Sequence, residues 1–420
     1  MRIEVVTIGD ELLLGFTIDT NAAHLARALA AEGVEIVRRT TCGDTAESIA
    51  SAVRDALERT GAVITTGGLG PTSDDLTKPS IAALFGREMV LDDDHLAWMK
   101  DRWRTRFQRE MPASNVQQAL LPAGARKLVN RHGSAPGIWL EDDRGRWVAM
   151  LPGVPREMRG MLADTLLPLV RERVGGAQRV VRSLTLRSTG IGESAIADLV
   201  ATLDGGVGAV NLAYLPNADG TDLRLTVRDV APDDADLRLA HSASRLRSIV
   251  GEFIYAEEST DLAAVVLDLC RMQGTTVGVA ESCTGGLLGA RLTAIPGSSD
   301  VMQGGVIAYA DAVKSSALGV PSAAIREHGA VSETVARAMA TGGRSAIGAD
   351  AVLSITGIAG PSGGTPDKPV GTVWIALDFR GTVDARRFLL IGDRTEIQRR
   401  ASQAALEMLR RALRAVATPS

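Results

Sequence analysis

The chain has 420 residues, of which 45% are hydrophobic, and this is enough for two or three globular domains. Its 46 Lys and Arg residues against 50 Asp and Glu residues give a formal net charge of -4, so it lacks the basic character typical of nucleic-acid-binding proteins. Cys42, Cys270 and Cys283 show neither metal-site nor disulfide spacing, which indicates a reducing environment. Without a cleavable apolar leader or a run long enough to span a bilayer, the sequence predicts a cytoplasmic protein that does not contact membranes.

The N-terminal part alternates between apolar strands and helices, which predicts parallel strands joined by right-handed crossovers. A ligand site is then expected at the carboxyl ends of the strands, where polar clusters follow the first and third of them. The expected strands are Ile3–Ile8, Val34–Thr40 and Ala62–Thr65, and the expected helices are Asn21–Ala31 and Ala46–Arg59.

The two polar clusters predict a phosphate site with oxygen ligands for a hard divalent cation. Backbone N–H groups would come from the loop residues Gly67, Gly68, Gly70, Thr72 and Ser73. Carboxylates would come from Asp10, Glu11, Asp74 and Asp75. The alternative is purely structural: Thr72 or Ser73 caps a helix whose first turn is stabilised by Asp74 and Asp75.

The middle of the chain, residues 177–257, predicts a smaller α+β unit. Gly190–Glu193 superficially resembles a GXXG loop that grips nucleic acid, but Glu193 and the absence of flanking lysines favour a structural spacer. The expected strands are Val180–Arg187, Ala209–Leu215 and Leu223–Asp229, and the expected helices are Ile191–Leu203 and Ala235–Val250.

Ser282 follows an expected strand, Thr275–Ala280, and precedes an expected helix, Leu287–Ala294. This position at a helix N-terminus predicts a nucleophile whose oxyanion is held by backbone N–H groups at Thr284, Gly285 and Gly286. The alternative is that Ser282 only caps the helix. Cys283 is the rival nucleophile, because thiolates are intrinsically more reactive.

Lys314 follows the expected strand Gly304–Ala308 in an alanine-rich neighbourhood. Desolvation favours a neutral amine, so a lysine there is a general-base candidate, the alternative being a solvated surface lysine. A glycine-rich loop follows the expected strand Ala351–Ile355 and predicts either a phosphate cradle or a surface hairpin before Gly371–Leu377. The loop residues concerned are Thr356, Gly357, Gly360, Gly363 and Gly364, and Arg394, before the expected helix Glu396–Ala415, is a further phosphate contact.

These motifs together resemble the CinA family. AESCTGGLLGARLTAIPGSS at residues 280–299, GGVIAYADAVKSSALGV at 304–320 and TGIAGPSGGTPDKPVGTVW at 356–374 resemble its C-terminal domain. GDEL at 9–12 and TGGLGPTSDDLT at 66–77 resemble its N-terminal molybdopterin-binding domain. The resemblance implies an α/β chain with a three-layer MogA/MoeA-like domain at 1–172, a KH-like spacer at 177–257 and the CinA deamidase domain at 260–418.

The resemblance implies hydrolysis of nicotinamide mononucleotide (NMN) to nicotinic acid mononucleotide and ammonia. Ser282 and Lys314 match the family's catalytic pair, Tyr309 joins the substrate-binding residues, and this reaction needs no cofactor. For the N-terminal domain it implies an ADP-ribose pyrophosphatase that uses a divalent cation, although Asp74 replaces an arginine of the wider pattern and argues against molybdopterin adenylation. A homodimer that binds only small nucleotides is expected. The alternatives are a non-catalytic adaptor in competence or DNA damage, and a molybdopterin-binding protein.

Overall fold

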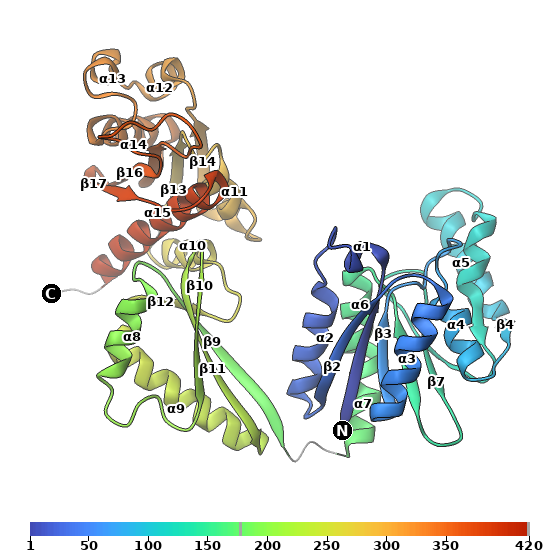
Figure 1. Ribbon diagram of the computed structural model, residues 1–420. Coiled ribbons are helices and arrows are strands. Elements are labelled where there is room, and N and C mark those ends of the chain that lie inside the picture. Colours follow the sequence, from blue (N-terminus) through green and yellow to red (C-terminus); the bar gives the residue numbers. More distant parts are fainter. Residues whose placement is uncertain (176–178, 418–420) are drawn as a thin grey trace. The chain divides into compact units, whose positions relative to one another are not determined.

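The computed structural model describes residues 1–175 and 179–417. The chain forms two compact units, the first comprising the residues up to Arg182 together with Val227–Leu237, and the second comprising Ser183–Thr226 together with the chain from Arg238 onward. Strands and helices alternate in both, which confirms the predicted mixed α/β class (Figure 1). None of the helices in the described residues combines the length and apolar character that a membrane span requires.

A six-stranded sheet forms the centre of the first unit, in the order β2-β1-β3-β8-β7-β6. The strands β2, β1 and β3 are parallel, as the sequence predicted, and β8, which the sequence analysis did not identify, is parallel to β3. At one edge β7 pairs antiparallel with β8, and β6 pairs antiparallel with β7. The antiparallel edge gave no clear sequence signal because its strands are short. The strands are β1 (Arg2–Ile8), β2 (Glu35–Cys42), β3 (Ala62–Thr66), β6 (Arg126–Leu128), β7 (Gly137–Glu141) and β8 (Trp147–Leu151), with a separate pair β4 (Met89–Leu91) and β5 (Leu120–Pro122).

Helices cover both faces of this sheet and form a three-layer arrangement. Leu25 and Leu29 of α2 pack with Met158 of α6 on one face, and Val53 of α3 packs with Ile81 of α4 on the other. The helices are α1 (Asp10–Leu13), α2 (Thr20–Ala31), α3 (Ala46–Thr60), α4 (Thr77–Leu84), α5 (Asp93–Phe107), η1 (Ala113–Ala119), α6 (Pro155–Met161), η2 (Leu162–Leu166) and α7 (Leu167–Val174).

A four-stranded sheet follows in the chain, in the order β10-β11-β9-β12. The hairpin of β10 and β11 is antiparallel and turns at Ala218 and Asp219, and β12 is antiparallel to β9. The elements are β9 (Val180–Ser188), α8 (Glu193–Ala201), β10 (Asn211–Asn217), β11 (Gly220–Val230), α9 (Pro232–Val250) and β12 (Ile254–Glu257).

The C-terminal part is built on a five-stranded sheet in the order β14-β13-β15-β16-β17. The strands β14, β13 and β15 are parallel, and β16 and β17 complete the sheet antiparallel. Because the three parallel strands end at the same edge, the segments that follow them are brought together there. The strands are β13 (Val277–Glu281), β14 (Met302–Ile307), β15 (Ala351–Gly357), β16 (Thr372–Phe379) and β17 (Thr382–Leu389).

Apolar helix faces cover this sheet on both sides. Leu267 of α10, Leu288 of α11 and Leu409 of α15 belong to the cluster on one side, and Leu318 of α12 and Met339 of α14 belong to the other. The helices are α10 (Leu262–Met272), α11 (Leu287–Thr293), η3 (Ser298–Asp300), α12 (Asp311–Leu318), α13 (Ser322–His328), α14 (Glu333–Ile347) and α15 (Arg394–Ala417).

Gly342 of α14 allows this helix to approach the end of α12 closely, because a Cβ atom at Gly342 would overlap with the carbonyl oxygen of Leu318. We expect Gly342→Ala to lower the free energy of unfolding by about 1–3 kcal/mol, since backbone must move to relieve the overlap. Thr341→Ala, at the neighbouring exposed position, is the matched control and should change it by less than about 0.5 kcal/mol. Urea unfolding of both variants measures the difference, and an unchanged midpoint for Gly342→Ala would contradict the close packing.

Candidate active site

Ser282 lies directly after β13, at the edge where the three parallel strands end. Its N–H donates to Ile355 O of β15 at 2.9 Å, and the preceding carbonyl, Glu281 O, accepts from Ala308 N after β14 at 2.7 Å. Only 7% of Ser282 is exposed. The serine is therefore held between the two neighbouring strands at the sheet edge that the sequence predicted.

The side chain of Glu281 organises the turn that follows Ser282. Its buried carboxylate accepts from Gly286 N at 3.0 Å, Leu288 N at 3.1 Å and Gly289 N at 2.8 Å. These are N–H groups at the start of α11, whose N-cap is Gly286 at φ 100°, a conformation that favours glycine. Glu281 thus takes the place at the helix N-terminus that the sequence assigned to an oxyanion.

The N–H groups of Gly285 and Gly286, which the sequence predicted as oxyanion donors, already have acceptors within this turn. Gly285 N donates to Ser282 O at 3.1 Å, and Gly286 N is bound to Glu281. Ser282 precedes the N-cap by four residues, so it does not cap α11 either. Thr284 differs, because its hydroxyl is buried and has no hydrogen-bond partner among the described residues.

Cys283 is a poor nucleophile in this setting. The side chain belongs to the apolar cluster beneath α15, and burial raises the pKa of its thiol to about 12, with a smaller contribution in the same direction from Glu281. A thiol with such a pKa stays protonated near neutral pH, and the thiolate is the reactive form. Electrostatics therefore favour Ser282 over its neighbour.

Lys314 lies on the first turns of α12 and is only 2% exposed, which excludes the solvated alternative. Its Nζ donates to Tyr309 O at 3.1 Å and lies 3.3 Å from Asp311 Oδ1. Among the described residues, no hydrogen bond joins Lys314 to Ser282. Lys314 and Ser282 lie on the segments that follow the adjacent parallel strands β14 and β13.

Arg394 connects two of the segments that the sequence assigned to the substrate. Its guanidinium donates through Nη1 to Gly360 O at 2.8 Å and through Nη2 to Tyr309 Oη at 2.9 Å. Four residues further along α15, Gln398 Nε2 donates to Cys283 O at 2.7 Å. The N-terminal turns of α15 therefore hold the nucleophile loop, the glycine-rich loop and Tyr309 together.

The glycine-rich loop does not form a simple phosphate cradle from all the predicted residues. The Thr356 hydroxyl donates to Ala330 O at 2.8 Å, and Gly357 is paired with Val373 in the sheet, with no room for a Cβ atom. Gly363 and Gly364 lie in an exposed stretch of the loop. Gly360 is buried and bound to Arg394, so it is the loop glycine most directly tied to the other site residues.

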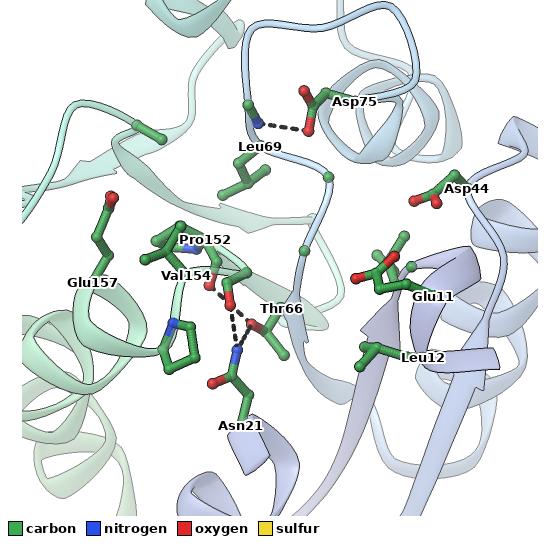
Figure 2. Close-up of a pocket in the computed structure, with 18 of the residues that line it drawn as sticks. Glu11, Leu12, Asn21, Asp44, Thr66, Leu69, Asp75, Pro152, Val154 and Glu157 are labelled. Carbon is green, nitrogen blue, oxygen red and sulfur yellow. Dashed lines mark hydrogen bonds between the residues drawn. The ribbon is translucent and has the colours of Figure 1, made fainter. Parts of the chain in front are cut away.

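A second site lies in the first unit, where a cavity of about 470 Å³ opens at the carboxyl ends of β1, β3 and β8 (Figure 2). Asn21 at the start of α2 lines it and donates to Thr66 Oγ1 at 3.1 Å and to Gly153 O at 2.7 Å. Asn21 is only 8% exposed, and its Oδ1 has no partner among the described residues. The predicted location of a ligand site at this sheet edge is therefore matched by a cavity.

The loop after β3 is held by one carboxylate. Asp75 accepts from Gly70 N at 2.7 Å (Figure 2). It also accepts from Thr72 N at 2.8 Å and from the Thr72 hydroxyl, so these predicted phosphate donors are already used. Gly67 N is used as well, because it donates to Leu151 O. Gly68 lines the cavity, whereas Ser73 is exposed and does not. The helix-capping alternative is also wrong, since α4 begins at Thr77 with Leu76 at its N-cap.

The four carboxylates predicted as metal ligands do not form one metal site. Glu11, Asp74 and Asp75 line the cavity, whereas the Asp10 carboxylate accepts from Asp44 N at 3.3 Å and does not line it. Across residues 1–175 and 179–417, no group of three or more His, Cys, Asp or Glu side chains is placed to hold a metal ion. The described side chains therefore form no preformed cage of three such ligands.

Several buried polar residues of these sites were not found from the sequence. The signal for Glu281 was available, because a carboxylate at the end of an apolar strand and before glycines needs buried N–H partners. Asn21 and Lys78 gave no such signal. Lys78 of α4 is buried and donates to Gln117 O, and burial lowers the pKa of its ammonium to about 8, while the charge of Asp75 acts in the opposite direction.

Comparison with known proteins assigns the chain to a family. A CinA-like protein of Gemmatimonas aurantiaca is 64% identical over 98% of this chain and 96% of its own length, and another of Salinibacter ruber is 44% identical over 98% of this chain and 100% of its own length. The chain belongs to the CinA family. Family models for the CinA C-terminal domain, a probable molybdopterin binding domain and the CinA KH domain match residues 259–413, 4–172 and 183–256.

A solved structure gives a partial match to this CinA-family chain. The match to the crystal structure of the competence/damage inducible protein CihA from Agrobacterium tumefaciens covers 36% of this chain and 93% of the CihA chain. The sequence identity is 40% and the TM-score is 0.36. The matched families describe the same three kinds of domain that the sequence predicted, and they are compatible with a hydrolase.

Proposed function

We propose that the chain is an NMN amidohydrolase that releases ammonia and forms nicotinic acid mononucleotide. The observation that carries the proposal is that Ser282 and Lys314 are both buried and lie on the segments that follow the adjacent parallel strands β13 and β14. Burying a lysine costs free energy when no equally buried carboxylate is paired with it. Residues buried at such a cost are characteristic of functional sites. The Asp311 carboxylate beside Lys314 is 58% exposed.

In this reaction Ser282 Oγ attacks the carboxamide carbon of NMN while Lys314 Nζ accepts the hydroxyl proton. The ammonium formed is stabilised by the acceptors already beside it, Tyr309 O and Asp311 Oδ1. Lys314 then returns the proton to the leaving amine, and ammonia departs. Water attacks the resulting ester while Lys314 accepts a proton from this water. Lys314 then returns this proton to Ser282 Oγ as the acyl bond breaks, and nicotinic acid mononucleotide leaves with the serine hydroxyl and the neutral lysine regenerated.

The Thr284 hydroxyl is the donor that we assign to the oxyanion of the tetrahedral intermediates. It is buried, lies two residues after the nucleophile and has no partner in residues 1–175 and 179–417, whereas the N–H groups of Gly285 and Gly286 already have acceptors. An unpartnered donor in a dry site stabilises developing charge without first losing another hydrogen bond. The Arg394 guanidinium, held by Gly360 and Tyr309, supplies positive charge for the phosphate of the substrate.

The choice of nucleophile can be tested by two single substitutions in the full-length chain. Ser282→Ala should lower kcat for NMN deamidation by at least about 1000-fold, because the attacking atom is lost. Cys283→Ala is the matched control at the next position and should retain most of the activity, at a stability cost of about 1 kcal/mol for the buried sulfur. Ammonia release measures both. An inactive but folded Cys283→Ala variant beside an active Ser282→Ala variant would reverse the assignment.

The role of Lys314 as a base is tested by Lys314→Arg. A guanidinium keeps the positive charge but cannot accept a proton, so kcat should fall by about 100-fold or more, nearly as far as in Lys314→Ala. Circular dichroism and thermal unfolding report whether each variant is folded. Substantial deamidation by folded Lys314→Arg protein would show that Lys314 acts only through its charge.

We propose a second hydrolytic function, cleavage of ADP-ribose at its pyrophosphate, for the cavity of the first unit. The observation that favours it is the unpartnered, buried Asn21 Oδ1 in a cavity large enough for a nucleotide. A hydroxyl or amino group of the ligand would supply the missing donor. Since the described carboxylates do not form a metal cage, we assign no step to a resident metal.

Asp75→Ala tests this second function because it releases Gly70 N and Thr72 N and so opens the loop along the cavity. We expect ADP-ribose hydrolysis, assayed with added Mg²⁺ or Mn²⁺, to fall at least about tenfold. NMN deamidation by the same preparation should stay near that of the wild type, because its residues lie in a different unit. Failure of the wild type to hydrolyse ADP-ribose, or an equal loss of both activities in folded Asp75→Ala, would reject the assignment. A chain without either activity would instead favour a non-catalytic adaptor.

A further inference from the structure

A cavity in the second unit lies apart from the residues assigned to the deamidase reaction. Its volume is about 370 Å³, within the range of small-molecule sites. Its walls come from α15, β17, the segment after β9 that contains Gly190 and Ile191, and the turn between β10 and β11. The GXXG-like segment therefore faces helix α15 of the same unit.

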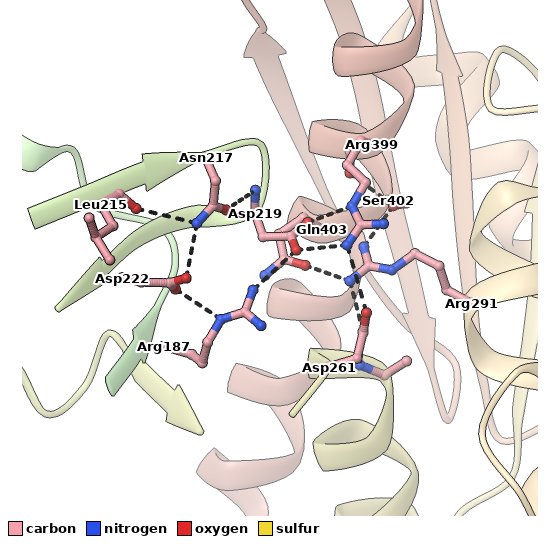
Figure 3. Close-up of polar contacts among 11 residues, drawn as sticks. Arg187, Leu215, Asn217, Asp219, Asp222, Asp261, Arg291, Arg399, Ser402 and Gln403 are labelled. Carbon is pink, nitrogen blue, oxygen red and sulfur yellow. Dashed lines mark hydrogen bonds and ion pairs between the residues drawn. The ribbon is translucent and has the colours of Figure 1, made fainter. Parts of the chain in front are cut away.

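The acidic residues of this cavity are already neutralised. Asp219 accepts from Arg399 at 2.8 Å through both carboxylate oxygens and from Arg187 at 3.2 Å (Figure 3). Glu407 is bound by Arg410 and by Arg411, each at 2.6 Å. These carboxylates consequently leave little negative charge to repel an anion.

Two hydrogen-bond donors in the cavity wall are Arg400 Nε and Gln403 Nε2. Neither has an acceptor among the described residues. Both residues are on α15 and are three positions apart, so they lie on the same side of the helix. Gln403 is only 3% exposed, and its Oε1 accepts from Arg291 Nη2 at 2.8 Å, which fixes the orientation of the amide (Figure 3). Unpaired buried donors are unfavourable, so the pair calls for a ligand with acceptor atoms.

The rest of the wall is mainly apolar and includes Ile191, Phe253, Phe388, Leu390 and Met408. Arg386 and Arg411 also line the cavity, and their guanidinium groups are paired with Asp384 and Glu407. The Arg411 guanidinium also stacks over the Phe253 ring, with its Cζ 5.6 Å from the centroid. A ligand with an anionic group could accept hydrogen bonds from the donors and guanidinium groups, and an apolar ring of the same ligand could pack against the apolar side chains.

We propose that this cavity binds a nucleoside monophosphate, with the phosphate toward Arg400 and Gln403 and the base against the apolar wall. The site is separate from the one assigned to deamidation and does not depend on that function. Its ligand is a small molecule and not an RNA strand, because α15 already faces the segment that contains Gly190 and Ile191.

Isothermal titration of the full chain with AMP tests the proposal, with adenosine and inorganic phosphate as partial ligands. AMP should bind saturably with a Kd below about 1 mM, and each partial ligand should bind at least about tenfold more weakly, because each meets only one kind of wall. Equal affinity for phosphate and AMP would overturn the assignment of the apolar wall. Binding of a single-stranded RNA octamer without binding of AMP would overturn the small-molecule site.

Two substitutions locate the ligand. Arg400→Gln removes the charge and Nε, and Gln403→Glu keeps an acceptor oxygen for Arg291 while replacing the free donor by a negative charge. Each should weaken AMP binding at least about tenfold. Arg387→Gln is the matched control, because Arg387 neighbours Arg386 on β17 but does not line the cavity, and its affinity should match the wild type.

Thermal unfolding of the three variants checks that each is folded. Wild-type affinity in folded Arg400→Gln and Gln403→Glu would place AMP elsewhere in the chain and overturn the proposal. An equal loss of affinity in Arg387→Gln would also overturn it, because the effect would then reflect overall charge and not the cavity.

Discussion

The buried carboxylate of Glu281 is the interaction on which the arrangement around Ser282 depends. A buried charge is stable only when hydrogen bonds replace its hydration, and here three N–H groups of the following turn and α11 provide them. These bonds hold the turn that follows Ser282, in which the Thr284 hydroxyl has no hydrogen-bond partner among the described residues. In the first unit, Asp75 holds the glycine loop in a similar way, through Gly70 N and Thr72 N. In both sites a side chain occupies N–H groups that glycine-rich sequences commonly offer to a ligand.

Helix α15 links the segments of the second unit. Its first turns bind Gly360, Tyr309 and Cys283 O through Arg394 and Gln398. The next residue, Arg399, binds Asp219 at the tip of the β10–β11 hairpin (Figure 3). Nearer the end of the helix, Arg410 donates to Glu252 O. A ligand that contacts Arg400 and Gln403 therefore touches the same rigid helix that orients the nucleophile loop. Helix α15 therefore contacts both the loop that contains Ser282 and the cavity that Arg400 and Gln403 line.

The fold class and most helices and strands could be predicted because the spacing of apolar residues and the glycines that mark turns are local properties of the sequence. The expected helix Ala46–Arg59 differs from α3 by one residue, and the expected strand Ile3–Ile8 differs from β1 by one residue. The edge hairpin of β6 and β7 was missed, because a three-residue strand such as β6 carries too few residues to show alternation. The parallel pairing of β13 with β14 and β15 brings Ser282 and the segments after these two strands to one edge of the sheet.

The sequence by itself determined which residues carry reactive groups and on which sheet edge they gather, since strand direction and motif order decide both. Only the tertiary structure decided which groups are free to act. Gly285, Gly286, Gly70 and Thr72 look like ligand donors in the sequence, but nearby acceptors that fold onto them use their N–H groups. Likewise, burial of Lys314 and the high pKa of the Cys283 thiol arise from packing. Hydrogen-bond partners and desolvation depend on residues distant in the chain, and no local pattern encodes them.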